Sequence, residues 1–222
     1  MNVEELDTIA EKMTAHPNQC VMVGFNRRFS PHSVEIKSWL NSTPGPKCIM
    51  ITVNAGAIPA DHWTQDRAVG GGRIIGEACH FVDLARFFAG TPIQSTQAMS
   101  LGGTEGQLGD CAALQIAFEC GSIATINYLA NGSKDFPKER IEIFTAGKVM
   151  SCDNFRLSRE ISGNRKLKTS AQDKGHAAEV TAFIDTLSSG GDWPIPANEL
   201  LEVTRATIEL DKAVQASGSR TC

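Results

Sequence analysis

Val69 to Gly90 reads VGGGRIIGEACHFVDLARFFAG, and this stretch decides how the rest of the chain is interpreted. Its three glycines, at 70–72, carry no Cβ, so the backbone can adopt positive φ there and another group can approach it closely. Apolar residues then recur at helical spacing from about Cys79 to Phe88. The stretch therefore predicts a glycine-rich turn that leads into a helix packed on a core.

Three ionisable residues of this stretch, Glu77, His80 and Asp83, recur at every third position. If Glu77 already lies in the first helical turn, all three side chains stand on one face. A histidine between two carboxylates can transfer protons, although carboxylates favour its charged form and burial opposes it. We therefore predict His80 as a catalytic candidate with Glu77 and Asp83 beside it; a satisfied structural histidine is the competing interpretation.

Composition excludes several classes of protein. The chain has 222 residues and a net charge of -4, which gives no signal for nucleic acid or an anionic membrane as a partner. Seven cysteines without a CxxC pair and five histidines without HxxxH indicate neither a disulfide framework nor a metal site. Because free cysteines are typical of a reducing compartment and no apolar run approaches membrane length, we expect a cytoplasmic protein.

The first 25 residues have the pattern of one helix followed by one strand. Asn2 to Ala15 is predicted helical, with Asn2 as its cap, and Cys20 to Phe25 is a short apolar run of the buried-strand type. A buried parallel strand needs neighbours on both sides. We therefore predict that residues 1–25 are a remnant of a dinucleotide-binding domain whose earlier strands lie upstream of a truncated or engineered boundary. Neither 70–76 nor 101–109 fits the G-x-G-x-x-G fingerprint of such a domain.

Residues 26–222 are predicted to form one α+β domain. Helical periodicity covers 31–40, 176–187 and 198–216, and strand-like composition or alternation marks the remaining elements at 47–54, 93–99, 112–118, 122–129, 139–145, 148–152, 155–158 and 166–169. We expect an open, mainly antiparallel sheet of about six strands with helices packed on one face. Partner subunits usually cover the other face of such a sheet.

Several residues outside the central stretch allow two interpretations. Arg27 and Arg28 form either a salt bridge at the start of the domain or a substrate or phosphate contact. Trp63 lies in a long connection rich in charged and aromatic residues, where it either contributes to function or packs the loop onto the sheet. His176 begins a predicted helix, where it serves as a surface or capping residue or reaches a pocket.

The sequence resembles a known family. GGGRIIGEACHFVDLARFFAG, preceded by DHWTQD and GFNRRFSP in this order and spacing, is similar to the family of glucose-fructose oxidoreductase, inositol dehydrogenase and MocA (Gfo/Idh/MocA). The resemblance covers essentially the whole chain, but only the second part of a usual member. It implies an N-terminal Rossmann domain and a C-terminal α+β domain whose open sheet carries the substrate site and builds oligomers. It also implies NAD or NADP in the full-length protein, with no tight binding to this chain.

By the same resemblance, His80 is the proton-transfer residue and Asp83 orients it or binds substrate hydroxyls. Trp63 would lie beside the nicotinamide and the substrate, Arg27 at the junction of the two domains, and His176 near the pocket. Two departures stand out. The family's EKP lysine would precede residue 1, and Gly76 occupies the position where many members have an aspartate, so Glu77 is the candidate substitute.

These features lead to one main hypothesis and two alternatives. The main hypothesis is the substrate-binding and oligomerisation part of an NAD(P)-dependent oxidoreductase that acts on a sugar or cyclitol hydroxyl, inactive alone, and assembled as a dimer or tetramer through the open sheet face. One alternative is a non-catalytic carbohydrate-binding or assembly module. The other, a dehydratase or glycosidase that oxidises its substrate transiently, would use the same residues.

Overall fold

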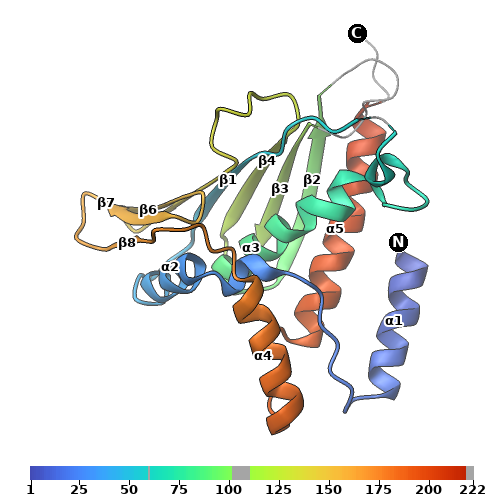
Figure 1. Ribbon diagram of the computed structural model, residues 1–222. Coiled ribbons are helices and arrows are strands. Elements are labelled where there is room, and N and C mark those ends of the chain that lie inside the picture. The colour runs from blue at the N-terminus through green and yellow to red at the C-terminus, as the bar shows by residue number, and fades with distance from the viewer. Residues whose placement is uncertain (60, 102–110, 219–222) are drawn as a thin grey trace.

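The computed structural model describes residues 1–59, 61–101 and 111–218 (Figure 1). The predicted loop at 101–109 lies almost wholly outside these residues. The helices are α1 (Val3–Ala15), α2 (Pro31–Asn41), α3 (Cys79–Ala89), α4 (His176–Ser189) and α5 (Ala197–Gly218), with short helical turns η1 (Asn26–Phe29), η2 (Trp63–Gln65) and η3 (Ile74–Ala78). The strands are β1 (Cys48–Asn54), β2 (Ile93–Ser100), β3 (Ala112–Phe118), β4 (Ile123–Leu129), β5 (Glu139–Thr145), β6 (Lys148–Asp153), β7 (Leu157–Ile161) and β8 (Lys166–Lys168).

Within the described residues the strands form one eight-stranded mixed sheet in the order β2-β3-β4-β1-β5-β6-β7-β8. The expected α+β class is confirmed, but the prediction of about six mainly antiparallel strands is corrected in two respects. The sheet is larger, and it is mixed: six of its seven described strand pairs are antiparallel, as predicted, but β1 runs parallel to β4, with Cys48 opposite Ile123. Strand periodicity does not report direction, because direction is set by where the chain re-enters the sheet. Here β1 enters between β4 and β5, which later segments of the chain supply.

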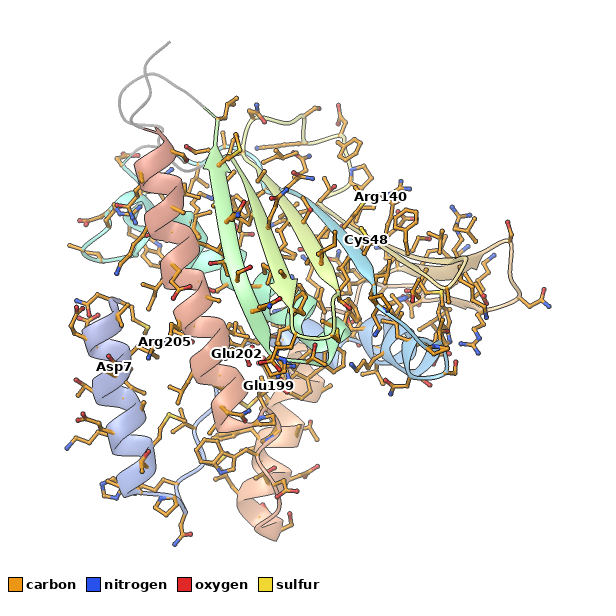
Figure 2. The ribbon with its side chains drawn as sticks, turned by 180° about the vertical axis from the view of Figure 1, so that it is seen from behind. Asp7, Cys48, Arg140, Glu199, Glu202 and Arg205 are labelled. Carbon is orange, nitrogen blue, oxygen red and sulfur yellow. The ribbon has the colours of Figure 1, made fainter. Side chains whose placement is uncertain are left out.

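One face of the sheet carries the core. In β1, Ile49, Ile51 and Val53 are wholly buried, whereas the alternating residues Cys48 and Met50 are exposed. This alternation is the consequence of the two-residue period of a strand with one covered face. Figure 2 looks onto the uncovered face, where Cys48 and Arg140 project from the strands.

The helices cover the other face (Figure 1). Helix α3 crosses the covered face of the sheet with Phe81, Leu84 and Phe88 wholly buried, and α5 packs along β2. Gly90 ends α3 in the left-handed conformation at φ 77°, as a helix C-terminus commonly requires. The predicted glycine-rich turn followed by a helix is therefore confirmed for 69–90, and the helix packs in the core.

The N-terminal segment forms one of its two predicted elements. Helix α1 begins with the expected capping box, in which Asn2 accepts from the Glu5 N–H at 2.8 Å and Glu5 accepts from the Asn2 N–H at 2.9 Å. The predicted strand Cys20–Phe25 does not form; these residues pair with no other strand, and Val23 is 38% exposed. An apolar run becomes a strand only where a neighbour offers hydrogen bonds, and the described chain provides none there.

Helix α4 is anchored at one end. Gly175 at its start lies against η1 so closely that a Cβ would be 2.4 Å from the carbonyl oxygen of Asn26, and Glu179 in its first turn is buried. Beyond this root the helix projects away from the body (Figure 1), and Val180, Ile184 and Leu187 are more than half exposed. No helix in the described ranges has the length and hydropathy that crossing a membrane requires.

Candidate functional site

The glycine stretch forms a close-packed turn. A Cβ on Gly70 would lie 2.6 Å from both the Thr64 Cα and the Trp63 carbonyl oxygen, and Gly71 and Gly72 have φ of 73° and 83°. Side chains at these positions would clash or strain the backbone, which explains the run of glycines. The turn feeds η3, a π-helical turn, immediately before α3. Because a π turn holds more residues than an α turn, it changes the direction of the side chains that precede α3.

His80 lies in the first turn of α3, half-buried. Its ring meets the ring of Phe25 edge to face, with centroids 6.1 Å apart, and its Nδ1 is buried with no hydrogen-bond partner among the described residues. Burial, followed by the charge of Arg27, lowers the pKa of His80 to about 4, against the opposing charges of Glu77 and Glu139. The imidazole is therefore neutral at pH 7, with a nitrogen that can accept a proton.

Glu77 is held by a cluster of three polar side chains. Its carboxylate accepts a hydrogen bond from the Tyr128 hydroxyl, from Lys138 Nζ at 3.1 Å and from Arg73 at 3.2 Å. Burial alone would raise the pKa of Glu77, but the Tyr128 hydrogen bond and the charge of Lys138 outweigh it and lower this pKa to about 2. Glu77 therefore acts as a fixed anion near His80.

The Asp83 side chain points into the core and does not face His80. The carboxylate is wholly buried and accepts two hydrogen bonds from Arg28, at 3.0 and 2.5 Å. Burial raises the pKa of Asp83 to about 6, because desolvation exceeds the effect of the Arg28 charge. The structure thus pairs Asp83 with the buried guanidinium of Arg28, a partner other than the predicted ones.

The ion pair between Arg28 and Asp83 is extended by contacts with helix α5. Arg28 also donates to Glu199 at 3.0 Å, and Arg86 bonds Glu202 at 3.1 Å. Both glutamates stand on α5 (Figure 2). These bonds join η1, α3 and α5, so for Arg28 the salt-bridge interpretation is the one the contacts favour.

Arg27 belongs to a separate ionic cluster that sequence reasoning did not find. It donates twice to Glu139, both at 3.0 Å, and Lys174 Nζ donates to the same carboxylate at 2.6 Å. The Arg27 guanidinium also lies over the Phe81 ring at 4.4 Å. Burial alone would raise the pKa of Glu139, but hydrogen bonding and charge from Arg27 outweigh it, so this pKa is lowered. A charged residue at the first position of an alternating strand was the available signal for Glu139.

The remaining predicted site residues lie at the surface. His176 is exposed at the start of α4 and is close enough to His80 to lower its pKa electrostatically. Trp63 is 62% exposed and stacks against His62, with ring centroids 5.8 Å apart. The structure therefore brings His80, Arg27, Glu77 and His176 into one electrostatic neighbourhood, separates Asp83 from it, and leaves Trp63 on the loop surface.

The described residues do not form a dinucleotide cradle or a metal site. Gly71 packs against Ile75, and Gly72 lies against the guanidinium of Arg67 in an irregular loop, so these glycines do not join a strand to a phosphate-binding helix. Among residues 1–59, 61–101 and 111–218, no three metal-binding side chains gather. What the arrangement can supply is a neutral proton acceptor flanked by fixed ions.

Comparison with known proteins gives consistent results. Residues 47–148 match the sequence profile of the GFO/IDH/MocA C-terminal domain. The uncharacterized oxidoreductase YrbE of Bacillus subtilis is 26% identical over 221 residues, covering 90% of this chain and 63% of that protein. Inositol 2-dehydrogenase of Rhizobium meliloti is 24% identical over 205 residues, covering 85% of this chain and 61% of its own length.

A solved structure shares the fold. The oxidoreductase domain protein from Kribbella flavida superposes with a TM-score of 0.80 at 17% identity, covering 97% of this chain and 69% of that one. The sheet, its helices and this likeness define the fold class as an α+β domain of the kind found in that protein. The matched C-terminal domain and both relatives support assignment of the chain to the Gfo/Idh/MocA family. It spans less than two thirds of the length of either relative.

Proposed function

We propose that this chain is the substrate-binding and assembly part of an NAD(P)-dependent oxidoreductase that acts on a sugar or cyclitol hydroxyl. One observation carries the proposal: His80 offers a neutral imidazole with a buried, unpartnered Nδ1 beside the Arg27–Glu139 and Glu77 clusters. The name of the Rhizobium meliloti relative supports a cyclitol substrate. Oxidation of a hydroxyl requires a base for its proton, and a neutral imidazole meets that requirement.

The dinucleotide would be the hydride acceptor, and the residues described above do not fit its phosphates. We assign the cofactor-binding half to the portion of the relatives that this chain does not match, with residues 1–25 as its last part and 26–222 as the substrate and assembly domain. In this arrangement His80 accepts the hydroxyl proton, Arg27 is held in place by Glu139, and Glu77 provides a fixed negative charge. Trp63 and His176 would border the site from the loop and from α4. Six described cysteines are unpaired, which supports a reducing compartment such as the cytoplasm.

Ligand binding to the chain tests the proposal directly. We expect myo-inositol and a panel of aldoses, titrated into protein labelled at its histidines, to shift the His80 imidazole signals and to leave His16 at the end of α1 unchanged. His80→Ala should abolish the response of neighbouring signals. NAD and NADP should give negligible heat in calorimetry. Ligand binding that leaves His80 unmoved, or clear micromolar binding of NAD, would remove the basis of the proposal.

A second candidate function, a non-catalytic assembly module, is favoured by the open sheet face. Its exposed residues on β2–β4 are uncharged, and they include Ser95, Gln97, Gln115 and Ile123, the last 51% exposed. A shallow hollow of about 220 Å³ lies over the same strands. An uncharged, partly apolar face can pack against a copy of itself without burying charge. We propose a second copy as its occupant, and dimerisation without any sugar response would favour this module over the enzyme.

A further inference from the structure

The β7–β8 hairpin concentrates positive charge at one edge of the sheet. Residues 156–168 include one acidic residue, Glu160, and five basic ones, whereas the whole chain has a net charge of -4. The basic residues are Arg156, Arg159, Arg165, Lys166 and Lys168. A local excess of this size in an acidic protein indicates a partner of opposite charge.

The strand register sorts these charges between the two faces. Arg159 lies directly opposite Lys166, and Lys168 lies opposite Leu157 one step along, so three cations share a face. Arg159 is also paired with Ser151, which in turn is paired with Glu142. This face is therefore a continuation of the open face of the sheet.

The carboxylate of Glu160, which belongs to the hairpin, forms its ion pairs on the opposite face. Glu160 pairs with Lys148 at 3.3 Å and with Arg165 at 3.9 Å, and Arg165 also reaches the Ser42 hydroxyl at the end of α2. On the open face, Glu142 and Asp153 are both engaged by Arg140, at 2.9 and 3.8 Å. No ion pair within the described chain engages Arg159, Lys166 or Lys168.

Like charges placed directly opposite across two strands destabilise a sheet. Lysines on an edge strand commonly protect it from pairing with other chains, and this accounts for Lys166 and Lys168 on β8. It does not account for Arg159, because β7 is paired on both sides and has no free edge. The repulsion between Arg159 and Lys166 therefore lowers the stability of the sheet, and a bound anion would offset this loss.

One further observation fits an anion on this hairpin. A hollow of about 540 Å³ lies against it, lined by residue 157 and residues 159–166. A phosphate group presents several acceptor oxygens, which match one guanidinium fork and two ammonium groups.

We propose that the open face of the β7–β8 hairpin binds a phosphate group of a small ligand through Arg159, Lys166 and Lys168. The site lies in the hairpin and does not involve His80 or any residue of its two ionic clusters. The proposal is therefore independent of the oxidoreductase assignment.

Calorimetry and amide NMR with pyrophosphate and inorganic phosphate, at constant ionic strength, test this site. We expect the wild type to bind pyrophosphate more tightly than phosphate, with shifts in β7 and β8. Arg159→Gln should weaken pyrophosphate binding by about tenfold, as the loss of a bidentate contact predicts. Lys212→Gln on α5 removes the same unit of charge from an exposed residue and should leave the affinity unchanged. Equal affinity in wild type and Arg159→Gln would overturn the proposal, and so would a wild-type response to chloride that equals the response to phosphate.

Two controls keep the result interpretable. Thermal unfolding without anion should show Arg159→Gln at least as stable as wild type, because the repulsion with Lys166 is relieved. Lys166→Gln on the edge strand repeats the test if Arg159→Gln fails to fold. Sedimentation, as a third measurement, reports the oligomeric state. A wild-type dimer that Arg159→Gln dissociates, with no phosphate response, would assign this face to a second copy and refute the phosphate site.

Discussion

Replacing Asp83 with alanine removes the buried partner of Arg28 and leaves the guanidinium in the core. Arg28 loses two charge-assisted hydrogen bonds, at 3.0 and 2.5 Å, and keeps the one to Glu199 at 3.0 Å. Breaking a buried ion pair from one side costs about 3–5 kcal/mol. Because Glu199 still compensates part of the charge, we expect a loss of about 3 kcal/mol in the free energy of unfolding.

Urea unfolding at 25 °C, followed by circular dichroism, measures this loss as a lower midpoint at unchanged slope. Asp83→Asn keeps the volume and one acceptor, so it should cost clearly less than Asp83→Ala. The double variant Arg28→Met, Asp83→Leu removes both charges and should be more stable than Asp83→Ala alone. A cost below about 1 kcal/mol for Asp83→Ala, the range of exposed ion pairs, would refute the claim that this pair fastens η1 to α3.

Three further predictions concern His80, the glycine turn and the open sheet face. His80 should titrate at about pH 4 by NMR, so its contribution to stability is complete above pH 6.5 and declines as the pH falls from 6.5 toward 4; a midpoint near 6.5 would contradict its burial. Gly70→Ala should lower stability by about 2 kcal/mol or more in urea unfolding, because a Cβ there meets fixed backbone at 2.6 Å, while Gly24→Ala, with nothing within 4 Å, should change it by less than about 0.5 kcal/mol. Ile123→Lys should turn any dimer into a monomer in sedimentation without changing Tm by more than a few degrees, and unaltered self-association would exclude this face.

Local sequence patterns predicted the elements well and their arrangement only in part. The period of the apolar residues placed α3 within a residue of its observed bounds, and capping chemistry placed the start of α1. Such signals depend on residues a few positions apart. The parallel β1–β4 pair and the unformed strand at 20–25 depend on which segments return beside them, and no short pattern contains that information.

For the candidate site, too, the sequence predicted local features better than tertiary contacts. The sequence predicted His80 between two carboxylates, because the regular spacing of Glu77, His80 and Asp83 suggested one shared face. The π turn before α3 instead directs Glu77 toward Tyr128, while Asp83 finds Arg28 in the core. Glu139 and Lys174 lie 112 and 147 positions after Arg27 in the sequence, so their cluster with it follows from the tertiary fold alone.

The free end of α4 has a practical consequence for anyone who purifies this chain. Val180, Ile184 and Leu187 are each more than half exposed on this helix, so concentrated samples will tend to aggregate or to adsorb to surfaces. Polar replacements at these three positions should reduce this tendency at little cost in stability, because each side chain is already more than half exposed.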